Sequence, residues 1–132
     1  MKAIKEIADK IISQLSPYMI IHRYDAFTTK SVYLKFDYGI VNSLRISDHK
    51  GKKHLNYKYN VIIDQTQKEV KNPNGYDMFF YPPSDIDELC SEIIKLKEQR
   101  LSVYRNYDAV INKVKNDIDF KTGFWNGAYQ VN

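Results

Sequence analysis

The sequence predicts an α+β fold, with an antiparallel sheet of four to five strands, an N-terminal helix and a long C-terminal helix. Near both ends of the chain, apolar residues recur every three to four positions. In the middle they alternate with polar residues, and glycine or proline separates the alternating stretches. The chain of 132 residues has the size of one ordinary domain, so we expect a single domain over residues 1–132.

The first helix is predicted over residues 3–15. Its apolar side chains share one helical face: Ile4, Ile7, Ala8, Ile11 and Leu15. Ser16-Pro17 ends this pattern. Two strands are expected next, over residues 18–24 and 32–36, before the turn signal at Gly39.

The clearest alternation predicts a basic β-hairpin from Ser43 to Ile63. Both predicted strands place an apolar side chain at every second position, and a polar connection rich in lysine lies between them. Gly51 in that connection can adopt a positive φ at low cost. Because side chains alternate across a strand, we expect one face to pack on the core and the other, with Arg45 and Lys58, to face solvent.

A further strand is predicted over residues 76–81, because Pro82-Pro83 cannot continue a ladder. Ser84 is a favourable residue for starting a helix, and acidic residues follow it in the first turn. Apolar positions keep helical spacing to residue 114. This helix is longer than a small sheet needs, so it either breaks or projects and pairs with a partner helix.

The tail over residues 119–132 is aromatic, with Phe124, Trp125 and Tyr129. This composition is unusual for a disordered end, so we expect the tail to dock on its own domain or on another molecule.

Composition favours a protein of the cytoplasm. Cys90 is the only cysteine, which excludes an internal disulfide and a zinc site of paired cysteines. The apolar runs are too short for a membrane span, so we expect no membrane association. Sequence motifs for a nucleophile, a phosphate loop or a carboxylate pair are absent, and we predict neither enzyme activity nor a cofactor. Cys90 is interpreted as a core residue rather than a nucleophile.

Two groups of residues are candidates for binding a partner. The formal net charge is +4, and residues 45–58 hold five basic groups against Asp48 alone, not counting histidines. Such a surface suits a phosphate backbone or an acidic protein, although solvated surface charges would give the same pattern. A second, aromatic and basic group lies on the long helix, where core packing is the alternative. The predicted partner-binding residues are Arg45, His49, Lys50, Lys52, Lys53, His54, Lys58, Arg100, Tyr104, Arg105 and Tyr107.

The segment Leu44-Arg45-Ile46-Ser47-Asp48-His49, with the lysine-rich turn and Tyr57-Lys58-Tyr59-Asn60 after it, resembles small phage and prophage proteins of low-GC Gram-positive bacteria. Some of these are similar to type II-A anti-CRISPR proteins, which inhibit Cas9. The start of the long helix, from Tyr81 to Leu89, also fits this group. The resemblance covers about residues 30–115. It implies a non-enzymatic inhibitor that binds Cas9 or the Cas9–guide RNA complex.

Two other functions remain open at this point. The basic hairpin is suited to binding nucleic acid directly, as a phage accessory protein would. The long helix is suited to a homodimer or another helix-mediated assembly.

Overall fold

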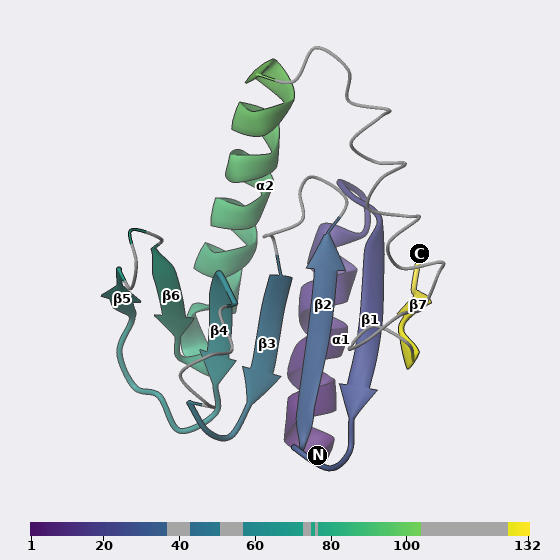
Figure 1. The fold of residues 1–132 in the computed structure, drawn as a ribbon, viewed down its shortest axis with the longest axis vertical. Helices are drawn as coiled ribbons and strands as arrows, with labels where there is room; N and C mark the ends of the chain where they lie inside the picture. Colours follow the sequence, from purple (N-terminus) through teal and green to yellow (C-terminus); the bar gives the residue numbers. More distant parts are fainter. Residues whose placement is uncertain (37–42, 51–56, 73–74, 76, 104–126) are drawn as a thin grey trace.

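The computed structural model describes residues 1–36, 43–50, 57–72, 75, 77–103 and 127–132. Figure 1 shows one sheet with both α-helices against the same face. In chain order the elements are α1 (Lys2–Leu15), β1 (Ile21–Ala26), β2 (Ser31–Phe36), β3 (Ser43–Ser47), β4 (Tyr59–Ile62), β5 (Glu69–Lys71), β6 (Met78–Tyr81), the 3₁₀ turn η2 (Pro83–Asp85), α2 (Ile86–Val103) and β7 (Tyr129–Gln130).

The general class, α+β with a helix before and a helix after most of the sheet, is as predicted. The sheet itself differs from the prediction. The described residues form seven strands in the order β5-β6-β4-β3-β2-β1-β7, and the pairing is mixed. β1, β2 and β3 form an antiparallel meander, whereas β3, β4 and β6 are parallel to one another. The predicted antiparallel sheet of four to five strands is therefore wrong in strand number and in direction.

The predicted hairpin from Ser43 to Ile63 is the main correction. Its two strands exist as β3 and β4, but they run parallel, with Leu44 beside Tyr59 and Ser47 beside Ile62. A parallel pair needs a crossover connection rather than a tight turn. Alternation identifies the strands without specifying direction, because Leu44 and Tyr59 reach the same face in either pairing.

The main core lies between the helices and one face of the sheet. Four of the five residues of the apolar stripe predicted for the first helix are buried, and Ile7 is partly buried. The predicted range of residues 3–15 matches α1 to within one residue. On α2, Leu89, Cys90 and Ile93 are buried against the same core. β6 ends before Pro82, as predicted, and η2 precedes the regular helix. The predicted continuation of this helix beyond Val103 lies outside the described residues. Among the described helices, none is long and apolar enough to cross a membrane.

The opposite face of the sheet is also buried in its central strands. Tyr33 packs between Tyr24 and Tyr57, with ring centroids 6.2 and 5.1 Å away. Asn60 is buried on this face and its Nδ2 donates to the carbonyl oxygen of Tyr57 at 3.0 Å. Arg45, beside Asn60, is buried too. The expectation that this face is solvent-exposed is therefore wrong for β3 and β4.

The last six residues pack against β1. β7 pairs with β1, which places Gln130 beside His22. The Asn132 side chain accepts a hydrogen bond from the Ile21 amide at 2.9 Å and donates to the carbonyl oxygen of Met19 at 2.6 Å. Gly127 has a specific role, because a Cβ there would lie 2.8 Å from the Tyr24 ring. Residues 119–126 of the predicted tail lie outside the described residues.

Candidate partner-binding surface

Arg45 occupies a buried position in the middle of β3. It is only 1% exposed, although the sequence pattern predicted it on a solvated binding face. Its guanidinium donates to the carbonyl oxygen of His49 through Nη1 at 3.1 Å and to His49 Nδ1 through Nη2 at 2.8 Å. Among the described residues it has no carboxylate partner, and its Nε has no hydrogen-bond partner. Arg45 therefore organises the chain after β3 instead of presenting its charge to a partner.

His49 connects two turns at this end of the sheet. A guanidinium can only donate, and Arg45 Nη2 lies closer to His49 Nδ1, at 2.8 Å, than to Nε2, at 3.4 Å, so this geometry favours Nδ1 as the acceptor and Nε2 as the donor. Nε2 then donates to the carbonyl oxygen of Thr29 at 3.1 Å, in the turn between β1 and β2. Ser47 strengthens the arrangement, since its hydroxyl donates to the carbonyl oxygen of His49 at 2.6 Å. The turn after β3 is thereby fixed to the turn after β1.

The two turns and the start of α1 form one end of the molecule, at the bottom of Figure 1. We call this the turn surface and define it by Lys5, Phe27, Lys30, Asp48, His49 and Lys50. Phe27 is 69% exposed, the largest value among the exposed large hydrophobic residues of the described chain. Lys5 Nζ lies 5.0 Å from the centre of the Phe27 ring. Lys50 is paired with Glu69 at 3.2 Å, and Asp48 lies 3.9 Å from His49 Nε2.

The structure brings two of the predicted binding residues, His49 and Lys50, to the turn surface. Lys58 is half-buried at the far end of the sheet, and its Nζ lies 5.9 Å from the ring centre of Phe79. Arg100 belongs to α2. The other predicted binding residues lie outside the described part of the chain: Lys52, Lys53, His54, Tyr104, Arg105 and Tyr107.

Sequence reasoning missed Phe27, Lys5 and Lys30. Lys5 is an ordinary polar residue on the predicted first helix, and Lys30 lies between the two strands predicted before Gly39. A signal for Phe27 was available, because a large aromatic residue stands beside Thr28-Thr29-Lys30 in a segment predicted as a connection. Aromatic residues are uncommon in turns unless they pack or bind.

A second concave surface lies at the opposite end of the sheet, where β4 and β6 begin. It encloses about 170 Å³ between these strands and α2. Tyr59, Phe79 and Tyr81 form its stacked aromatic floor, with successive ring centroids 5.9 and 6.4 Å apart. Lys68 Nζ lies 5.1 Å from the Tyr81 ring centre and forms an ion pair with Glu88 at 2.8 Å. We call this the aromatic groove. Lys58 and Lys95 line the groove together with the acidic residues Asp77 and Glu92.

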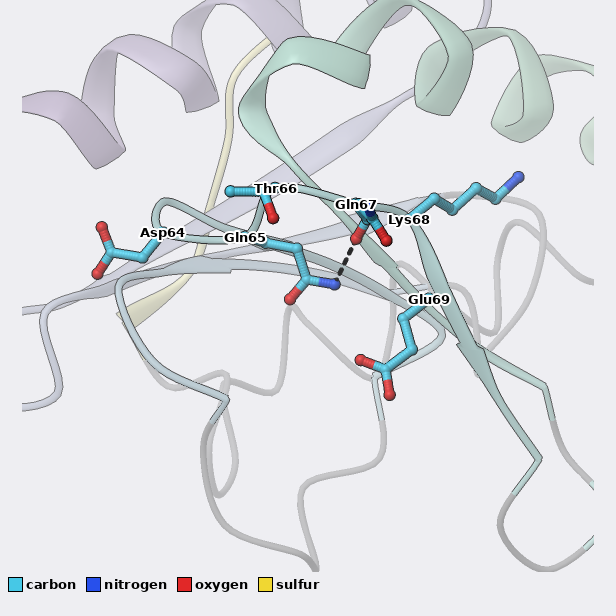
Figure 2. Close-up of a pocket in the computed structure, with 6 residues that line it drawn as sticks. All are labelled: Asp64, Gln65, Thr66, Gln67, Lys68 and Glu69. Atoms are coloured by element: carbon cyan, nitrogen blue, oxygen red, sulfur yellow. Dashed lines mark hydrogen bonds between the residues drawn. The ribbon is translucent and has the colours of Figure 1, made fainter.

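Figure 2 shows a third depression, of about 360 Å³, in the loop between β4 and β5. Six consecutive residues line it, from Asp64 to Glu69, and Gln65 Nε2 donates to the carbonyl oxygen of Gln67 at 2.8 Å. Its lining is polar and comes from one loop. No group of three potential metal ligands occurs among the described residues.

Cys90 is buried against the core, and burial raises the pKa of its thiol to about 12. Since only the thiolate is nucleophilic, its population at pH 8 to 9 is roughly a thousandfold lower than that of an ordinary cysteine. We expect iodoacetamide to leave native Cys90 unmodified over an hour at pH 8.5 and to alkylate it fully in guanidinium chloride, as measured by intact mass. Rapid alkylation of the native protein would contradict this burial.

The combination of a firmly held turn, an exposed aromatic ring and surrounding lysines is typical of a protein-binding module. Residues 29–102 match the family model described as colicin immunity protein / pyocin immunity protein. The match covers more than half of the chain, from the β1–β2 turn to α2, so the chain belongs to this family. Immunity proteins of this family bind a partner protein. Searches of curated proteins and of solved structures found no match.

Proposed function

We propose that this chain is an immunity protein that binds a colicin-type or pyocin-type toxin and blocks its activity. The family match over residues 29–102 carries the proposal. On this proposal the protein acts in the cytoplasm, where it is made together with the toxin. It acts by stoichiometric binding and has no enzyme activity of its own.

The distribution of exposed groups supports a binding role. The depression of Figure 2 is polar and open, and a small-molecule site would usually be concave and mostly apolar. The turn surface instead offers one exposed aromatic ring and several charges on elements that are hydrogen-bonded to one another. Interfaces draw most of their free energy from such aromatic anchors.

Protection of growing cells tests this function. Each toxin of a panel of colicin-type and pyocin-type toxins is expressed from an inducible promoter, with this chain on a second plasmid. We expect cells to survive when the chain is made in at least equal amount to the toxin, and to die when it is made in clear deficit, because binding is stoichiometric. A plasmid with an early stop codon is the control. Killing that is unchanged by a large excess of folded protein would refute the proposal.

The Cas9 inhibitor indicated by the sequence resemblance stays a prediction, as does its phage origin. On that prediction, the purified chain abolishes DNA cleavage by a type II-A Cas9. Direct nucleic-acid binding and a homodimer through the long helix also stay predictions. Our first choice is the toxin, because the family match favours it.

A further inference from the structure

We propose that the turn surface is the part of the protein that docks on the toxin, with Phe27 as the anchor in an apolar cavity ringed by acidic side chains. This inference rests on the proposed function and adds the binding residues and the chemistry of the partner's site. Three observations support it: the turn that carries Phe27 is held by hydrogen bonds, Phe27 is exposed, and lysines lie nearby.

Several interactions hold the turn under Phe27 in one shape. The Lys30 amide closes it by donating to the carbonyl oxygen of Phe27 at 3.4 Å. Lys30 itself has a φ of 50°, a left-handed conformation that lysine rarely adopts. The carbonyl oxygen of Thr29 accepts both from the Ser31 hydroxyl at 3.1 Å and from His49 Nε2 at 3.1 Å. A turn fixed in this way loses little conformational freedom when it binds, which favours affinity.

The ring of Phe27 is a suitable anchor because most of its area is available to a partner. A single exposed apolar residue is common on protein surfaces and needs no function. Phe27 differs because it stands on the fixed turn and has a cation, Lys5, over its ring. The ring therefore presents one apolar edge in a defined orientation, which a complementary cavity can enclose.

The charges around Phe27 indicate an acidic partner. Lys5 and Lys30 form no ion pair with any residue of the described ranges, so their charges are available. The chain as a whole carries a formal charge of +4. An acidic rim on the toxin would pair with these lysines and speed association.

The other exposed features fit a partner less well. In the aromatic groove, Tyr59 and Tyr81 are buried, and acidic and basic residues both line it, so it offers neither an exposed ring nor charge of one sign. β5 is an edge strand, but it has only three residues, two of them charged, a composition that discourages pairing with another strand.

Binding of colicin-type and pyocin-type toxins, measured by titration calorimetry, tests the inference with variants of the full chain. Phe27→Ala should raise the Kd about 30-fold or more, as removal of a central anchor does. Tyr18→Ala is the matched control, because Tyr18 is 52% exposed away from the turn surface. It should leave the Kd within about twofold.

A second pair of variants tests the charges. Lys5→Gln with Lys30→Asn removes two charges from the turn surface, and asparagine tolerates the positive φ at position 30. Lys10→Gln with Lys95→Gln removes two charges elsewhere. We expect the first pair to slow association about tenfold at low salt and the second to leave it nearly unchanged.

The outcomes separate this inference from the proposed function. Tight binding by the wild type that Phe27→Ala leaves intact would overturn the docking surface while the immunity function stands. Absence of binding by the folded wild type would overturn the function and the inference with it. Circular dichroism of each variant shows whether it is folded. If the association rates of the two double variants depend equally on salt, the proposal of an acidic partner is refuted.

Discussion

Replacement of Arg45 by alanine is expected to lower the free energy of unfolding by about 3 kcal/mol or more. Arg45 is among the largest fully buried side chains of the described chain. Its loss leaves a cavity and removes the two guanidinium hydrogen bonds to His49. Because a small domain is stable by only about 5 to 15 kcal/mol, this is a large part of the total. Denaturation in urea measures it.

Arg45→Met is the matched variant, because it fills most of the volume but cannot donate hydrogen bonds. We expect it to cost about 1 to 2 kcal/mol, which separates the hydrogen bonds from the cavity. A loss below about 1 kcal/mol for Arg45→Ala would show that the side chain lies on the surface, as the sequence pattern first suggested.

Replacement of Arg23 by alanine is expected to have the second large effect and to lower the free energy of unfolding by about 2 to 3 kcal/mol. Arg23 faces α1 from β1 and donates to Asp25 through Nε at 2.7 Å and to Asp9 through Nη1 at 2.8 Å. Burial disfavours its charge, but the hydrogen bonds to Asp25 and Asp9 raise the pKa of Arg23 above its ordinary value. Without Arg23, the Asp25 carboxylate, whose side chain is 16% exposed, would lose its cation.

Two comparisons test this explanation. Asp9→Asn should cost less than about 1 kcal/mol, because the Asp9 side chain is 70% exposed and its ion pair is screened by water. Removal of both Arg23 and Asp25 should cost less than the sum of the two single changes, since neither charge is then left unpaired. If urea denaturation shows that the double variant loses as much free energy of unfolding as the two single variants together, Arg23 and Asp25 are not a coupled pair.

The elements of this fold were predictable where the signal is local. Apolar spacing identified α1, and proline after Tyr81 identified the end of β6. The sheet order was not predictable, because a period of two assigns residues to strands and faces without giving the direction of pairing. β4 lies between β3 and β6 and is parallel to both, although β6 comes later in the chain.

The candidate site was only partly predictable for a related reason. Alternation places Arg45 on the face opposite Leu44, which is correct, but polarity alone suggests exposure, which is wrong. Its partner His49 is four residues away and is brought to it by the turn after β3. The contact between His49 and Thr29 joins residues twenty positions apart, and no sequence pattern signals it.

Titration of the purified wild-type chain with colicin-type and pyocin-type toxins tests the central claim most directly. We predict a one-to-one complex in the calorimeter and loss of toxin activity in the same molar proportion, because the chain acts as a stoichiometric inhibitor. A folded chain that gives no binding heat at several temperatures, comigrates with no toxin in gel filtration and leaves every toxin fully active would contradict the assignment of this chain as an immunity protein.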